Sequence, residues 1–220
     1  MTDQSPIPGR WRLKVALVGG LGLAAIWIAG IALGDRVPPL DSWIVDHLYS
    51  RPQTVPSAVA ALVSGAGTLI ALALLLAAVS DLLRRRRAQG ARLLTRHAAL
   101  LAACLATLAL QAVFQRPGPP VTAQDWTYPS GHVTLLTALA FTAFMISREL
   151  TAAWRATVLI AGTTTLVAVS AGRVTLGEHY LLDVVAAVLA TLGVGLIAVA
   201  VLNLTRDPGP PPRKSRSAES

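Results

Sequence analysis

Six long apolar runs, separated by short segments rich in arginine, constrain this chain more than any other feature of its sequence. A helix needs about 20 mostly apolar residues to cross a hydrocarbon core roughly 30 Å thick. The hydrophobic share of 54% and the charged share of 14% lie outside the usual range of soluble folds. We therefore expect an all-α integral membrane bundle of six transmembrane helices. The expected spans are residues 15–33, 57–83, 93–114, 133–147, 156–170 and 180–204.

The basic residues are distributed unevenly between the segments that join these runs. Lysine and arginine favour the cytoplasmic side of a membrane protein. If both termini are cytoplasmic, 15 of the 19 basic residues lie inside, and the exceptions are Arg36, Arg51, Arg116 and Arg173. We therefore expect cytoplasmic termini and a multi-pass protein of the cell membrane. The first run is longer than the roughly 7–15 residues of a signal-peptide core, which favours a retained span over a cleaved leader.

The chain is expected to hold one domain with short polar ends. Residues 1–13 form the expected cytoplasmic N-terminal segment, residues 14–204 the six-helix domain, and the proline-rich residues 205–220 a disordered cytoplasmic tail. Residues 38–52 repeat apolar side chains at helical spacing, which predicts a short helix on the outer surface with Asp41 or Ser42 as its cap. The net charge of +8 comes without a basic face bearing aromatic side chains, so we expect no nucleic-acid partner.

The outer segment before the sixth run, GRVTLGEHYLLD, places several ionisable side chains at the edge of an apolar stretch. His179 and Asp183 are four residues apart and so share one side of a helix. We expect Asp183 to accept the Nδ1 proton of His179, which leaves Nε2 free as a nucleophile or base. Arg173 offers a planar positive fork suited to phosphate oxygens, and Glu178 is expected to be solvated. A purely structural His179–Asp183 pair is the alternative, but an aspartate within an apolar span is costly and favours a functional role.

The outer segment before the fourth run ends in YPSGH. Pro129 suits a helix start, and Ser130 is either a cap or a ligand contact. Free backbone N–H groups at a helix start, such as that of Gly131, bind anions, and His132 can donate a proton to a leaving oxygen. Because the expected orientation places this segment and GRVTLGEHYLLD on the same side, we expect them to form one site.

These residues resemble the pattern of the type 2 phosphatidic acid phosphatase (PAP2) superfamily, which also includes vanadium haloperoxidases. The family pattern has three motifs, Lys-x6-Arg-Pro, Pro-Ser-Gly-His and Ser-Arg-x5-His-x3-Asp. The second motif is intact at residues 129–132. The third matches at Arg173, His179 and Asp183, with Gly172 in the serine position. The resemblance covers most of the chain, and its motifs occur in order on one expected face.

The first motif departs from the family pattern. With Pro119 as the family proline, Gln111 occupies the lysine position and Gly118 the arginine position, so both cations are missing. Arg116 lies two residues earlier, and the flexible backbone around Pro117 and Gly118 allows it to turn toward the site. Each missing charge-assisted hydrogen bond would otherwise contribute roughly 1.5 to 3 kcal/mol to phosphate binding.

The resemblance implies a metal-independent phosphatase, without a cofactor, that works through a phosphohistidine at the outer leaflet. The implied catalytic residues are His179 as nucleophile, Asp183 as its orienting group and His132 as general acid. The implied substrate-binding residues are Arg173, Ser130, Gly131 and Arg116. The substrate would be a lipid phosphate or a polyprenyl diphosphate monoester, such as phosphatidic acid or undecaprenyl diphosphate. Two alternatives stay open, a phosphotransferase that uses an acceptor hydroxyl and a catalytically weak or silent relative that binds lipid phosphates.

Overall fold

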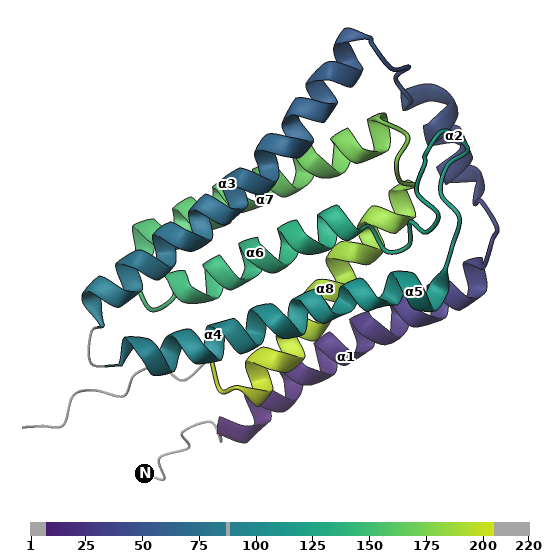
Figure 1. Cartoon of the computed structure of the whole chain (residues 1–220). Coiled ribbons are helices and arrows are strands. Elements are labelled where there is room, and N and C mark those ends of the chain that lie inside the picture. Colours follow the sequence, from purple (N-terminus) through teal and green to yellow (C-terminus); the bar gives the residue numbers. More distant parts are fainter. Residues whose placement is uncertain (1–7, 87–88, 205–220) are drawn as a thin grey trace, which may run out of the picture.

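The computed structural model describes residues 8–86 and 89–204, and this part of the chain is helical without any strand (Figure 1). The all-α prediction is therefore confirmed. The expected tail at 205–220 and residues 1–7 of the expected N-terminal segment lie outside the described residues. The elements are α1 (Pro8–Leu33), α2 (Pro39–Leu48), α3 (Val55–Arg85), α4 (Gly90–Leu105), the 3₁₀ turn η1 (Ala106–Ala109), α5 (Leu110–Phe114), α6 (Gly131–Ser147), α7 (Ala152–Thr175) and α8 (Leu181–Val201).

Five helical segments of the described chain are long and apolar enough to cross a membrane. They are α1, α3, the continuous run of α4, η1 and α5, α7 and α8. The helix α6 is apolar but shorter, at 17 residues. These six segments coincide with the six apolar runs of the sequence, although α7 extends further at both ends than the expected span of 156–170.

The helix α6 lies at the centre of the bundle, where it contacts α3, α4, α7 and α8 (Figure 1). One apolar cluster joins α6 to α3 and α7 through residues such as Leu82, Leu136 and Val169. A second joins α6 to α4 and α8 through residues such as Leu100 and Val199. Because α6 is held on all these sides, the residues at its first turn have a fixed position relative to the ends of α7 and α8.

The two ends of the bundle differ in chemistry. The long loop after α5, the start of α6, the turn between α7 and α8, and α2 gather at one end (Figure 1). The clustered arginines lie at the other end, about 26 Å away along α6 by the rise of an α-helix. The described members of this set are Arg10, Arg12, Arg84, Arg85, Arg86, Arg92, Arg96, Arg148 and Arg155.

The short helix predicted between the first two spans is confirmed as α2. Its cap was predicted wrongly, because Pro38 is the N-cap residue and Asp41 is fully buried in the first turn. Asp41 and Ile44 form the buried side of α2, whereas Leu40 and Trp43 stay more than half exposed. This helix therefore directs a carboxylate into the end of the bundle.

Candidate active site

Both polar segments that the sequence singled out meet at this end of the bundle. The backbone N–H of Ser130, at the start of α6, donates to the carbonyl oxygen of Asp183 in α8, with 3.0 Å between the atoms. In the loop before α6, the N–H of Thr127 donates to the carbonyl of Arg116 at 3.0 Å. The loop, the start of α6 and the start of α8 are thus tied together by main-chain hydrogen bonds. The main-chain hydrogen bonds therefore fix the positions from which the side chains of these segments extend.

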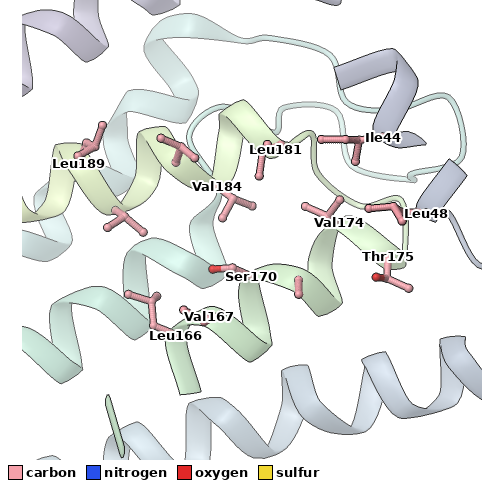
Figure 2. A pocket seen from close by; sticks show the side chains of 13 residues that line it. Ile44, Leu48, Leu166, Val167, Ser170, Val174, Thr175, Leu181, Val184 and Leu189 are labelled. Atoms are coloured by element: carbon pink, nitrogen blue, oxygen red, sulfur yellow. The ribbon is translucent and has the colours of Figure 1, made fainter. Parts of the chain in front are cut away.

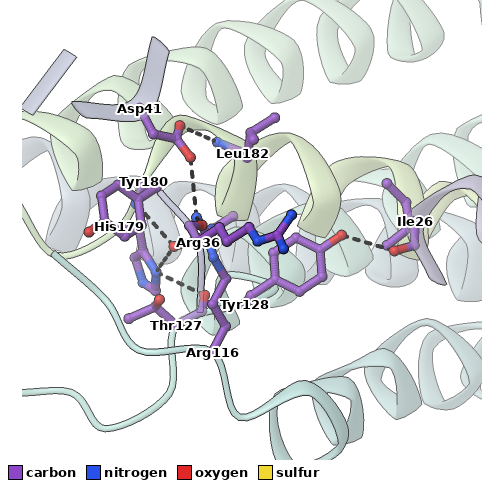
Figure 3. A network of polar contacts seen from close by, with 10 residues as sticks. Ile26, Arg36, Asp41, Arg116, Thr127, Tyr128, His179, Tyr180 and Leu182 are labelled. Atoms are coloured by element: carbon purple, nitrogen blue, oxygen red, sulfur yellow. Dashed lines mark hydrogen bonds and ion pairs between the residues drawn. The ribbon is translucent and has the colours of Figure 1, made fainter. Parts of the chain in front are cut away.

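His179 is buried between these segments, with 1% of its surface exposed. Its Nδ1 lies 3.2 Å from the carbonyl oxygen of Thr127 and 3.9 Å from the nearest carboxylate oxygen of Asp183 (Figure 3). The predicted partner of Nδ1 is therefore wrong, since the closer acceptor is a backbone carbonyl. A carbonyl oxygen can only accept, so Nδ1 carries the proton and Nε2 has a free lone pair. Nε2 is still available for reaction, because the Thr127 carbonyl accepts the Nδ1 proton in place of Asp183.

The surroundings of His179 favour its neutral form. Burial, together with the charges of Arg173 and His132, lowers the pKa of His179 to about 3, although the hydrogen bond to Thr127 opposes the shift. The free protein thus holds an uncharged imidazole at neutral pH, which is the form that a nucleophile requires.

Because its pKa is lowered, His179 is expected to stay uncharged throughout the range near neutral pH. In ¹⁵N-histidine spectra of the detergent-solubilised protein, the ring nitrogens of His179, assigned by comparison with His179→Gln, should keep neutral chemical shifts from pH 7.5 down to about pH 5. A midpoint for His179 at or above pH 6 would contradict the buried environment described here.

Several buried polar atoms around His179 have no hydrogen-bond partner among the described residues. Besides Oε2 of Glu178, which is ion-paired with Arg173, they include four groups: Nε2 of His179, Oγ of Ser130, Oγ1 of Thr127 and Nε of Arg173. Such atoms are rare in folded proteins, because burial without a partner is costly. Three of the four groups can donate a hydrogen bond and the fourth is a nucleophilic lone pair. This combination is suited to an oxyanion whose central atom is attacked by Nε2.

The start of α6 adds further donors to the same place. Ser130 is the N-cap residue, yet its side chain makes no capping hydrogen bond, so the hydroxyl is free to contact a ligand. Gly131 is the first helical residue, and N–H groups at such a position attract anions. His132 is half-buried in the first turn of α6. The structure therefore brings together Ser130, Gly131, His132 and His179, as the sequence predicted.

Arg116 is also buried here, but it faces carboxylates (Figure 3). One guanidinium nitrogen lies 2.5 Å from Oδ1 of Asp183, and the other lies 3.5 Å from Oδ2 of Asp41 and 3.1 Å from the carbonyl oxygen of Arg36. The guanidinium carbon lies 4.8 Å from the centre of the Tyr180 ring, close enough for a cation–π contact. Arg116 is thus occupied by internal partners, and its predicted role as a substrate ligand stays a prediction.

Asp183 is held by the same network rather than by His179. Its Oδ2 accepts the backbone N–H of Tyr180 at 3.0 Å, which forms a cap at the start of α8. Asp41 accepts the N–H of Leu182 at 3.2 Å. Burial raises the pKa of Asp41, and the hydrogen bond from Leu182 and the charge of Arg116 oppose this rise. Arg116 therefore links α2, the loop after α5 and α8 into one buried ionic network.

The first family motif fits the structure best in a register shifted from the one predicted. A Cβ on Gly118 would lie 2.4 Å from Cγ2 of Thr127, so this position packs against the loop and has no space for an arginine. The buried Arg116 and the exposed Pro117 that follows it supply an Arg-Pro sequence, and counting back from it places Ala109 at the lysine position. Gln111 lies beside Gly131, with its amide 3.4 Å from where a Cβ on Gly131 would be.

Sequence reasoning missed three groups that form contacts in the site. They are Asp41, the carbonyl of Thr127 and the ring of Tyr180. Asp41 shares the face of Ile44 on α2, three residues apart, and this was the available signal that it points inward. Backbone carbonyl partners carry no sequence signal. In the described part of the chain, no three His, Cys, Asp or Glu side chains are arranged to hold a metal ion.

An apolar groove of about 530 Å³ lies between α7 and α8, next to α2 (Figure 2). Its wall includes Val174 and Val184, which directly follow Arg173 and Asp183 in the sequence. These two valines also pack with Val133, the neighbour of His132, in one buried cluster. A single apolar layer therefore separates the groove from the polar site.

Comparison with known proteins identifies the family of this chain and a solved structure with a similar fold. The PAP2 superfamily model matches residues 97–207, half of the chain, and this range contains both polar segments. The chain therefore belongs to the PAP2 superfamily, as the resemblance predicted. Its fold matches the crystal structure of a transmembrane PAP2-type phosphatidylglycerolphosphate phosphatase from Bacillus subtilis, with a TM-score of 0.55 and 20% identity over 86% of this chain and 94% of that one. No curated protein matched the sequence.

Proposed function

We propose that this protein is an integral membrane phosphatase that hydrolyses a lipid phosphate or polyprenyl diphosphate monoester at the outer leaflet. The observation that carries the proposal is the buried, neutral His179, whose unpartnered Nε2 shares a site with unpartnered donors from Ser130, Thr127 and Arg173. Membership of the PAP2 superfamily and the fold shared with a membrane phosphatase support the same activity.

In the proposed first step, Nε2 of His179 attacks phosphorus and the bond from phosphorus to the ester oxygen breaks. His132 gives its proton to the departing oxygen, so the alcohol or phosphate leaves in its protonated form. The Gly131 N–H, the Ser130 hydroxyl and Arg173 stabilise the equatorial oxygens. In the second step, neutral His132 takes a proton from water, the resulting hydroxide attacks phosphorus, and the bond between phosphorus and Nε2 breaks. This step releases phosphate and restores both histidines, and none of these steps requires a metal ion.

The placement at the outer leaflet rests on two properties of the bundle. The site and the clustered arginines lie at opposite ends, and arginine clusters favour the cytoplasmic side. With six spans and both termini inside, the site then faces outward. The helix α6 has 17 residues, near the lower limit for a span, so a site at its first turn lies at the depth of lipid headgroups.

The apolar groove supports a lipid as the substrate rather than a soluble phosphoester. Its volume lies within the range of small-molecule sites, and its lining is almost entirely aliphatic. A hydrocarbon chain in this groove would run along α7 and α8, one side-chain layer from the residues that act on phosphorus. We propose that the groove holds part of the substrate's chain.

Filling the groove should therefore reduce activity on long-chain substrates selectively. Ser170→Trp places an indole among the lining residues. We expect kcat/KM for a long-chain lipid phosphate to fall about 10-fold or more, because each methylene excluded from the groove forfeits about 0.8 kcal/mol. Activity on a water-soluble phosphomonoester should stay within about 2-fold of wild type. Ile160→Trp, on a strongly exposed part of α7, is the matched control, and an equal loss in both variants would contradict a specific groove.

The proposed function is tested by measuring phosphate release from a panel of lipid phosphates and diphosphates in detergent micelles. Turnover with release of inorganic phosphate would support the hydrolase. Product phosphate transferred to an added alcohol would identify the phosphotransferase. Binding without turnover across the panel would identify the catalytically silent relative and would overturn the proposal.

A further inference from the structure

Glu178 pairs with Arg173, a cation that would otherwise be available to bind a phosphoryl group. Its carboxylate forms an ion pair with Arg173, whose side chain is 7% exposed. The other arginine of the site, Arg116, is paired with Asp183 and Asp41, which are fully buried. The Glu178 side chain is 32% exposed, so it is the carboxylate in this set that can leave its arginine at the lowest desolvation cost.

The end of α7 explains why Glu178 meets Arg173. The N–H of Glu178 donates to the carbonyl of Arg173 at 3.1 Å, and the N–H of Gly177 donates to the carbonyl of Val174 at 2.9 Å. Together with the positive φ of Gly177, these bonds form a Schellman motif that folds the chain back over the last turn of the helix. The motif places the Glu178 side chain over that of Arg173, five residues earlier in the sequence.

Glu178 also has space into which it can move. It lines a cavity of about 490 Å³ between the start of α3, the loop after α5 and the turn after α7. The polar members of the lining include Ser50, Gln53, Ser57, Thr122 and Gln124. This cavity can solvate a displaced carboxylate, whereas Asp41 and Asp183 have only buried surroundings.

We propose that Glu178 is a built-in competitor for Arg173, which a phosphoryl group displaces into this polar cavity. The inference rests on the proposed function for its biological meaning, because a competitor at Arg173 weakens the hold on product phosphate and so speeds its release. Glu178 acts through Arg173 and is therefore a positioning residue, without contact to the reacting atoms.

The test is calorimetric titration of the detergent-solubilised protein with inorganic phosphate, which requires no turnover. Glu178→Gln keeps the size of the side chain and removes its charge, so phosphate should bind about 10-fold more tightly or better. Glu178→Ala should give the same direction of change and serves as a second variant if the first fails to fold. Asp125→Asn removes an equal charge from an exposed position in the loop after α5 and should leave the affinity within about 2-fold.

A double variant separates competition from a general charge effect. In an Arg173→Gln background, Glu178→Gln should give no gain in phosphate affinity, because the guanidinium for which Glu178 competes is missing. Equal or weaker binding by Glu178→Gln, or the same gain with and without Arg173, would overturn the inference. A protein that binds phosphate as expected but hydrolyses no lipid phosphate would refute the proposed function and leave the inference standing.

Discussion

Replacing His179 with alanine is expected to reduce phosphate release by roughly 10⁴-fold or more, because removal of a nucleophile that acts with its acid partner abolishes the covalent route. Its Nε2 is the buried lone pair around which the unpartnered donors gather. His132→Ala should lose about 10²- to 10⁴-fold, the usual contribution of a general acid. Initial rates on the best lipid phosphate, measured at equal amounts of folded protein, give both values.

The controls for this result use the other features of the same end of the bundle. His47→Ala removes an exposed histidine that stacks on Trp43, and it should retain wild-type rates. His179→Asn keeps a side chain that can donate to the Thr127 carbonyl, so it distinguishes lost chemistry from lost packing. If His179→Asn or His179→Ala kept more than about a tenth of the activity, histidine would not be the nucleophile.

Arg116→Ala is expected to destabilise the protein by about 3–5 kcal/mol, because Asp183 and Asp41 would remain buried without their partner. For a chain of this size such a loss corresponds to a fall in Tm of about 10 °C. Thermal unfolding in a fixed detergent, followed by intrinsic fluorescence, measures the shift. Arg51→Ala, an exposed arginine at the same end, should leave Tm nearly unchanged.

A second substitution tests the cause of this effect. Asp41→Asn in the Arg116→Ala background removes one of the two stranded charges, so it should restore part of the lost Tm although it destabilises the wild-type protein. An Arg116→Ala protein with wild-type Tm and weakened phosphate binding would contradict the network. Such a result would support the role as substrate ligand that the first motif suggested.

The architecture of this chain could be predicted because it depends on local composition. Apolar runs define helices wherever a bilayer is the solvent, and the described helices follow those runs to within a few residues at most ends. One polar segment ends at His132 and the other contains His179. They could be assigned to the same side of the membrane because the distribution of arginines among the loops predicts the orientation of the chain. These inferences depend on the composition of single segments or on the number of basic residues in each loop. They require no knowledge of side-chain packing.

The partners inside the site could not be predicted in the same way. Asp183 was assigned to His179 because four residues separate them, but Arg116, 67 residues away, lies 2.5 Å from its carboxylate. The acceptor of His179 is a main-chain carbonyl, and any residue type at position 127 would supply one. Glu178 was expected to be solvated, and the turn that directs it to Arg173 depends on hydrogen bonds at the end of α7. Each error concerns a choice between competing partners that only tertiary structure resolves.

The most direct test of the proposed mechanism is an experimental structure of the protein with orthovanadate. We expect vanadium bonded to Nε2 of His179, with its oxygens near Ser130 and the Gly131 N–H and with His132 at the opposite apical oxygen. Vanadate bound elsewhere, or seated here with His132 turned away from every oxygen, would contradict the assignment of these two histidines as nucleophile and acid.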